Sequence, residues 1–210
     1  KIEEIDYIKK QIIIIDDGST DKSYELIKSF NYVSEYKIIK HGSNIGKGAC
    51  IKSAQRQVSG DIVIIQDADL EYDPRDYKRL LEPIENGKAD VVYGSRFIGS
   101  DEKRVLLFWH TVGNKFLTLL SNMFTNLNLT DMENCYKVFK KDIITKIELK
   151  ENRFGFEPEF TAKISKIKNI RIYEVGVKYH GRNYSEGKKI TWKDGISAIR
   201  CIILYSLFKF

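Results

Sequence analysis

The sequence has 210 residues, of which 42% are hydrophobic and 30% are charged, a balance that suits one globular domain with an ample core. Its three cysteines are too few and too far apart for a disulfide framework or a zinc site, so we expect a reducing, cytoplasmic location. A secretory leader is not evident, and no apolar run approaches the roughly 18 residues of a membrane span. The net charge of +6 suits nucleic acid, anionic lipid or phosphorylated small molecules equally well.

In the first half, short apolar runs alternate with amphipathic segments. Strands are predicted at residues 12–15, 36–40, 62–65 and 91–93. Helices are predicted at residues 22–30, after the glycine-rich turn 42–48, and from Pro74. This order predicts an α/β fold with a doubly wound, mostly parallel central sheet flanked by helices. We expect the run 62–65 to be buried on both faces, as in the middle of a parallel sheet.

The second half is less regular. Helices are predicted at residues 105–124, 154–167 and 192–210, and a strand at 170–179, while 131–139 should return toward the sheet. The last helix carries four apolar residues in register: Ile196, Ile199, Ile203 and Leu207. A basic loop, 180–189, precedes it.

Three carboxylates follow one of the predicted strands directly. Asp67, Asp69 and Glu71 stand at alternate positions just after the run 62–65. In open α/β sheets, ligands bind outside the carboxyl ends of the strands. Mg²⁺ is usually held there by one or two carboxylates together with substrate phosphates. The stretch therefore predicts a metal site that carries a diphosphate, and an ordinary acidic turn is the alternative.

The glycine-rich turn 42–48 matches neither of two common phosphate-binding patterns. Only three residues separate Gly42 from Gly46, and Gly48 follows Lys47 where a Walker loop needs Ser or Thr. The turn also lacks Gly-x-Gly-x-x-Gly, which disfavours a dinucleotide-dependent oxidoreductase.

Four motifs in order carry a resemblance to a known family. They are Ile-Ile-Asp-Asp-Gly-Ser-Thr-Asp (14–21), Asn-Ile-Gly-Lys-Gly (44–48), Gln-Asp-Ala-Asp-Leu-Glu (66–71) and Gly-Ser-Arg (94–96). With them the chain resembles a family 2 glycosyltransferase of the GT-A fold, in the branch related to dolichyl-phosphate mannose synthase. The resemblance implies a UDP- or GDP-sugar donor, Mg²⁺ or Mn²⁺ as cofactor, and inversion at the anomeric carbon.

The resemblance also implies roles for particular residues. It implies that the nucleotide sugar is bound by residues of the first three motifs: Ile15, Asp17, Gly18, Lys47, Asp67 and Ala68. It assigns the metal to Asp69 and Glu71, although relatives often have Gln at the latter position. It implies a single domain over 1–210, with a nucleotide-sugar half (1–100) and an acceptor-side half (101–210) that ends in a helical subregion. Relatives begin with a strand ending in Pro-x-Tyr-Asn-Glu, which this sequence lacks, so we expect only part of the donor site here.

Basic residues predict how an acceptor is bound. We expect a phosphate to be held by cations from separate loops: Arg96, Arg104, Arg182, Lys188 and Lys189. In the resembling branch that phosphate belongs to a polyprenyl lipid, whose dianion is already nucleophilic and needs no base. A saccharide hydroxyl acceptor would need one, and the candidates are Asp131, Glu157 and Glu159. We therefore expect Asp69, Arg96 and Asp131 to be the catalytic residues. Simple solvation is the alternative for the two lysines, and complementing a helix N-terminus for the two glutamates.

Two apolar segments with basic neighbours, 105–109 and 202–208, predict peripheral contact with the inner face of the cell membrane. A buried core helix or a dimer surface is the alternative for the second. A non-catalytic sugar-nucleotide-binding module is a further alternative. Nucleic acid is disfavoured, because the basic residues are not interleaved with aromatic ones. The sequence leaves the hexose, the acceptor and the oligomeric state open.

Overall fold

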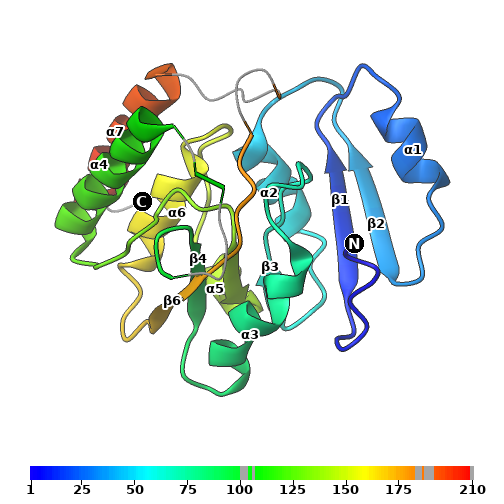
Figure 1. Cartoon of the computed structure of the whole chain (residues 1–210), viewed down its shortest axis with the longest axis horizontal. Helices are drawn as coiled ribbons and strands as arrows, with labels where there is room; N and C mark the ends of the chain where they lie inside the picture. The colour runs from blue at the N-terminus through cyan, green and yellow to red at the C-terminus, as the bar shows by residue number, and fades with distance from the viewer. Residues whose placement is uncertain (100–103, 106, 183–185, 187–191, 209–210) are drawn as a thin grey trace.

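A computed structural model describes residues 1–99, 104–105, 107–182, 186 and 192–208. Strand β1 (Gln11–Asp16) pairs in parallel with β2 (Glu35–Lys40), and α1 (Ser23–Ser29) connects them. These strands confirm the predicted runs 12–15 and 36–40. They form a small sheet at one side of the molecule (Figure 1).

The larger sheet has the strand order β3-β5-β4-β6. Its strands are β3 (Ile62–Ile64), β4 (Val91–Ser95), β5 (Lys137–Lys140) and β6 (Ile172–Gly176). β4 and β6 are parallel, whereas β5 lies between β3 and β4 and is antiparallel to both. The α/β class predicted from the alternation of elements is therefore confirmed, with β5 as the strand that runs against its neighbours.

Helices cover both faces of this larger sheet because its strands alternate their side chains. Val92 and Val138 pack in one core cluster with α3 (Tyr77–Glu85), which directly follows the 3₁₀ helix η1 (Pro74–Asp76). Val91, Tyr93 and Phe139 face the other way, where they pack with α5 (Lys141–Lys146) and α6 (Phe156–Ile164). Helix α5 was not predicted.

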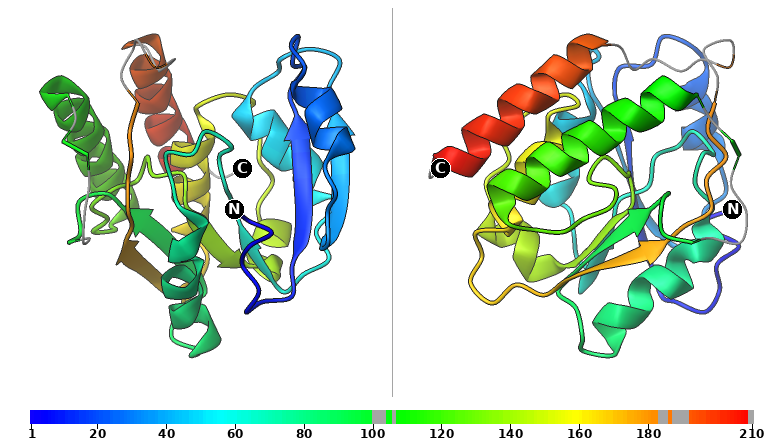
Figure 2. Two further views of the ribbon diagram at one scale, coloured as in Figure 1. Left: turned by 45° about the vertical axis from the view of Figure 1, so that its right-hand side comes forward. Right: turned by 60° about the vertical axis from the view of Figure 1, so that its left-hand side comes forward.

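Two long helices lie side by side beyond α6: α4 (Phe108–Thr125) and α7 (Trp192–Leu207) (Figure 2). The buried face of α7 is formed by Ala198, Cys201, Ile202 and Tyr205. The apolar register predicted for this helix is instead largely exposed, at Ile196, Ile203 and Leu207. The face with Ala198, Cys201, Ile202 and Tyr205 packs inward, so the neighbouring face with Ile196, Ile203 and Leu207 remains on the surface.

A gap separates the two sheets. β1 and β3 run in the same direction. Asp17 and Asp67, which follow the carboxyl ends of the two strands, both contact the segment 46–47. At the other end, Ser59 N, ahead of β3, donates to Gln11 Oε1 at the start of β1 (3.0 Å). In the described residues these strands do not pair with each other, and both line a cavity of about 800 Å³. β3 is only partly buried as a result, so the prediction of burial on both faces is wrong.

Candidate functional site

Asp17, just after β1, hydrogen-bonds the backbone of the glycine-rich segment 42–48. Asp17 Oδ2 accepts from Gly46 N (2.7 Å), while Oδ1 accepts from Ile45 N (3.1 Å) and pairs with His41 Nδ1 (2.7 Å). Burial would raise the pKa of Asp17, but these hydrogen bonds outweigh it and lower the pKa below its usual value. The carboxylate that the resemblance assigns to the nucleobase thus fixes the neighbouring loop, with Ile15 just ahead of it at the end of β1.

Two glycines allow this close approach. Gly18 has φ +71°, and a Cβ there would lie 2.5 Å from the carbonyl carbon of Ser43. Gly46 has φ +104°, and its Cβ would lie 2.5 Å from Asn152 O. Larger residues would separate the loops, so these positions require glycine for both conformation and space.

Asp17, His41 and Cys50 form the group of potential metal ligands found among the described residues. Burial raises the pKa of the Cys50 thiol to about 12, so the thiol stays protonated at neutral pH. His41 Nε2 also contacts Ser53 Oγ (2.9 Å). A metal ligand must be deprotonated. The hydrogen-bonded arrangement therefore fits a structural cluster beside the residues predicted to bind the nucleotide better than an ion site.

Helix α2 (Lys47–Gln55) begins with a lysine held by two carboxylates. Lys47 Nζ lies 2.9 Å from Asp67 Oδ2 and 2.8 Å from Glu157 Oε1. Burial would lower the pKa of Lys47, but Cys135, Glu157 and Asp67 raise it well above the ordinary value. Lys47 is therefore a fixed positive charge at the carboxyl end of β3, with Ala68 next to its partner Asp67.

The two carboxylates assigned to a metal converge on one positive group. Leu70 between them has φ +60°, a left-handed turn that brings Asp69 and Glu71 to the same side. Arg182 Nη2 lies 2.7 Å from Asp69 Oδ2, and Arg182 Nε donates to Glu71 Oε1 (3.0 Å). Burial raises the pKa of Asp69, and its acidic neighbours add to this effect, so a cation nearby is favourable.

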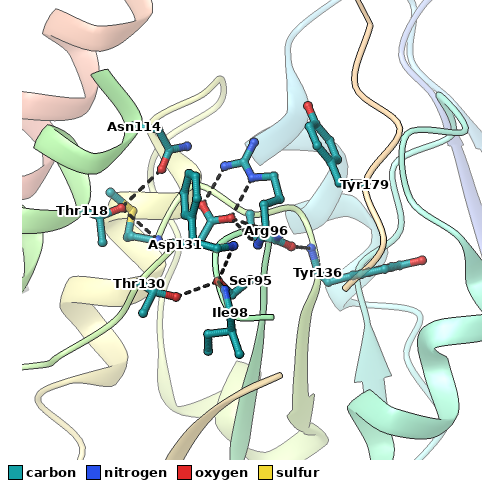
Figure 3. Close-up of polar contacts among 12 residues, drawn as sticks. Ser95, Arg96, Ile98, Asn114, Thr118, Thr130, Asp131, Tyr136 and Tyr179 are labelled. Carbon is teal, nitrogen blue, oxygen red and sulfur yellow. Dashed lines mark hydrogen bonds and ion pairs between the residues drawn. The ribbon is translucent and has the colours of Figure 1, made fainter. Parts of the chain in front are cut away.

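Arg96, at the end of β4, forms a two-pronged ion pair with the fully buried Asp131 (Figure 3). Its Nε and Nη2 donate to the two carboxylate oxygens at 2.7 and 2.6 Å, and its backbone N donates to Oδ2 at 2.9 Å. Burial would lower the pKa of Arg96, but Asp131 raises it well above the ordinary value. Both oxygens of Asp131 are occupied by this single guanidinium.

Tyr179 lies between Glu71, one of the two carboxylates assigned to the metal, and Arg96. Its Oη donates to Glu71 Oε2 (3.1 Å), and Arg96 Cζ lies 5.2 Å from its ring centre. Its carbonyl accepts from Arg104 N (3.1 Å). Arg104 Nη1 also donates to Gly181 O (2.9 Å), which brings three predicted acceptor cations to one neighbourhood. Lys188 and Lys189 lie outside the described residues.

Tyr179 and Glu133 were not among the site residues predicted from the sequence. Tyr179 ends a predicted strand directly ahead of the basic loop, and that position is the signal that could have identified it. Glu133 is two residues beyond Asp131, and its Oε1 is buried without a hydrogen-bond partner among the described residues. Burial, reinforced by Glu157, raises the pKa of Glu133 from 4.5 to about 8.

This pKa predicts an unusual pH dependence of stability. The folded-state pKa lies above the unfolded value, so the folded chain binds the extra proton and stability falls as pH rises from about 4.5 toward 8. Between pH 5 and 8 this loss amounts to roughly 3–4 kcal/mol, and we expect Glu133→Gln to remove it, as measured by urea unfolding at both pH values. The exposed Glu148→Gln variant should behave as wild type. Parallel wild-type and Glu133→Gln pH profiles would show that Glu133 ionises normally.

Comparisons with known proteins show the family of this chain. Residues 2–148 match the sequence profile described as glycosyl transferase family 2. The chain belongs to glycosyl transferase family 2. The prediction of a family 2 glycosyltransferase is thereby confirmed.

Two relatives of this glycosyltransferase have dolichol phosphate in their names. A dolichol-phosphate mannosyltransferase of Pyrococcus furiosus is 24% identical over 186 residues, covering 86% of this chain and 52% of that protein. A UDP-N-acetylglucosamine–dolichyl-phosphate N-acetylglucosaminyltransferase of Methanococcus voltae is 28% identical over 193 residues, covering 83% and 76%. The chain therefore spans about half the length of the mannosyltransferase.

A solved structure shows the same fold. Glucosyl-3-phosphoglycerate synthase from Mycobacterium tuberculosis has a TM-score of 0.69 at 17% identity, covering 96% of this chain and 71% of that one. The likeness confirms the predicted GT-A class of α/β fold.

Proposed function

We propose that this glycosyltransferase moves a hexose from a UDP- or GDP-sugar to a polyprenyl phosphate, with inversion at the anomeric carbon. The observation that carries the proposal is the gathering of Asp69, Glu71 and three arginines around Tyr179. An acidic pair beside a cluster of guanidinium groups suits a metal-bound diphosphate next to a second phosphate. The names of the relatives from Pyrococcus furiosus and Methanococcus voltae support a lipid phosphate as acceptor.

The donor side fits a hard divalent cation. Asp69 and Glu71 offer carboxylate oxygens, and they already share one positive group, so their geometry suits a cation between them. When bound, Mg²⁺ or Mn²⁺ supplies the Lewis acid that neutralises charge on the departing diphosphate. The Mycobacterium tuberculosis neighbour was crystallised with Mn²⁺ and UDP-glucose, which supports this choice. Lys47 adds a fixed positive charge on the same side.

On the acceptor side, Arg96 would hold the lipid phosphate, with Asp131 as the residue that orients Arg96. A phosphate oxygen forms the new bond to the anomeric carbon while the bond to the diphosphate oxygen breaks. The electron pair leaves with the nucleoside diphosphate, and attack from the opposite face inverts the centre. The phosphate dianion carries no proton that must be removed, so this reaction needs no general base.

The candidate bases for a hydroxyl acceptor are already engaged. Asp131 is paired with Arg96, and Glu157 is paired with Lys47. Glu159 is fully buried and accepts from Lys150 N (2.7 Å) and Glu151 N (2.8 Å). These contacts favour the phosphate acceptor over a saccharide hydroxyl. Among the described residues, the raised pKa of Glu133 is the one observation that would suit a general base for a hydroxyl acceptor.

A partition assay tests the acceptor. With radiolabelled UDP-glucose or GDP-mannose, Mn²⁺ and undecaprenyl phosphate, we expect label to move into the organic phase. Label that appears only on an added oligosaccharide would favour the hydroxyl alternative. Tight sugar-nucleotide binding without transfer to either acceptor would favour the non-catalytic alternative.

We also propose peripheral contact with the inner face of the cell membrane. No helix of the described residues is long and apolar enough to cross a bilayer. α4 nevertheless exposes an apolar ridge at helical spacing: Trp109, Val112, Phe116, Leu119 and Met123. Adjacent α7 exposes Trp192, Ile196 and Leu207. Exposed apolar ridges with aromatic residues suit the bilayer interface.

Vesicle binding tests this surface. We expect the chain to co-sediment with vesicles that contain anionic lipid, and a triple Ser variant at Phe116, Leu119 and Met123 to lose most of this binding because it removes apolar area. Leu26→Ser, at an exposed residue of α1, is the matched control and should bind as wild type. Undiminished binding of the triple variant would exclude the α4 ridge as the membrane contact.

A further inference from the structure

Arg182 binds the two carboxylates to which a divalent cation is assigned. Its side chain reaches both acids, and its backbone N also donates to Glu71 Oε1 (3.0 Å). The remaining oxygens are used as well, because Asp69 Oδ1 accepts from Glu71 N (3.2 Å) and Glu71 Oε2 accepts from Tyr179 Oη (3.1 Å). A guanidinium group stays protonated in proteins, so Arg182 is a permanent positive charge beside both acids.

The contacts of the Arg182 side chain with Asp69 and Glu71 cannot be kept when a metal ion binds the same carboxylates. Mg²⁺ needs carboxylate oxygens at about 2.0–2.1 Å and a nearly octahedral set of ligands. A guanidinium nitrogen 2.7 Å from Asp69 Oδ2 occupies the space in which the ion would bind. Electrostatics lead to the same conclusion: the two carboxylates carry two negative charges, and a divalent ion neutralises them without Arg182.

We infer that Arg182 is an internal counter-ion which a divalent cation must displace, so that metal loading frees a guanidinium for the anionic acceptor. This inference rests on the proposed function and adds an order to it: the metal and its diphosphate first, then the acceptor phosphate. Arg182 is thus a positioning residue whose partner depends on the state of the metal site.

The backbone ahead of Arg182 is anchored by several contacts. His180 N donates to Glu71 O (2.9 Å), and Tyr72 and Tyr179 form a β-bridge. Arg104 Nη1 holds Gly181 O (2.9 Å). Arg182 therefore begins from an anchored segment, and the ring of Tyr179 in that segment already lies beneath Arg96. A released Arg182 side chain stays near the other two arginines.

Mn²⁺ affinity without nucleotide is the direct test, with free Mn²⁺ measured by electron paramagnetic resonance. We expect Arg182→Gln to bind Mn²⁺ about 3- to 10-fold more tightly than wild type, because the competing charge is gone. Arg182→Lys keeps the charge but loses the two-pronged contact, so its affinity should be intermediate. Arg171→Gln is the matched control: Arg171 pairs with Asp90 at 2.8 Å away from the site, so its loss changes net charge equally.

The outcomes separate this inference from the proposed function. Equal or weaker Mn²⁺ binding by Arg182→Gln, with Asp69-dependent binding retained, would overturn only the displacement of Arg182. Tighter binding by both Arg182→Gln and Arg171→Gln would overturn it too, because the effect would then come from net charge alone. Absence of Asp69-dependent Mn²⁺ binding in Arg182→Gln as well as in wild type would overturn the inference, and its absence also in the presence of nucleoside diphosphate would overturn both. If Arg182→Gln does not fold, Arg182→Lys provides the same comparison.

Discussion

Replacing Asp69 by asparagine is expected to lower the rate of sugar transfer by about 10²–10³-fold, the usual effect of removing one group that stabilises charge in the transition state. The substitution keeps the size of the side chain but removes the negative charge that would hold the ion. The side chain of Asp69 is 25% exposed and lies on a loop outside the sheet strands, so the fold should persist. The measurement is steady-state transfer with Mn²⁺ at saturating sugar nucleotide.

A binding readout separates this effect from a folding defect. In wild type, nucleoside diphosphate with Mn²⁺ at about a hundredfold excess over Kd should stabilise the protein by about 2.7 kcal/mol in thermal unfolding. In Asp69→Asn that gain should fall to the value for nucleotide alone. Asp142→Asn removes a carboxylate from an exposed ion pair on α5 and should change neither readout. Wild-type turnover in Asp69→Asn would remove the acidic pair from the mechanism.

Local patterns were sufficient to predict most elements of the fold. The strand predicted at 36–40 and the helix predicted from Pro74 were both found in the structure, as β2 and as η1 followed by α3. The burial of β3 could not be predicted, because it depends on which strand lies beside it and not on its own residues. The antiparallel direction of β5 is likewise a property of the chain path.

The candidate site was predictable where its residues follow strand ends. Asp17, Asp67 and Arg96 are of this kind, since their roles were assigned from motifs that end β1, β3 and β4. The contact between Arg182 and Asp69 spans 113 positions of sequence, and no local period encodes such a pairing. The same holds for Lys47 and Glu157, which sequence analysis treated separately. A long-range ion pair is set by topology, so it becomes visible only in the structure.

Replacing Asp131 by asparagine is expected to destabilise the fold by about 3–5 kcal/mol, because it leaves a largely buried guanidinium without its counter-charge. Arg96 has an exposed side-chain fraction of only 18%, and Asp131 has none. Any protein that remains folded should also need more acceptor phosphate for half-maximal rate, since Arg96 is no longer oriented. Denaturant unfolding and acceptor titration check the two effects.

A double variant shows whether the loss comes from the pair itself. Arg96→Met combined with Asp131→Asn removes the unpaired charge, so it should be more stable than Asp131→Asn alone, and the coupling energy should be clearly favourable. The exposed pair of Asp142 and Lys146 provides the comparison: Asp142→Asn should cost at most about 0.5 kcal/mol. If Asp131→Asn proves as mild as Asp142→Asn, water reaches Arg96, and Asp131 is then accessible enough to act as a base for a hydroxyl acceptor.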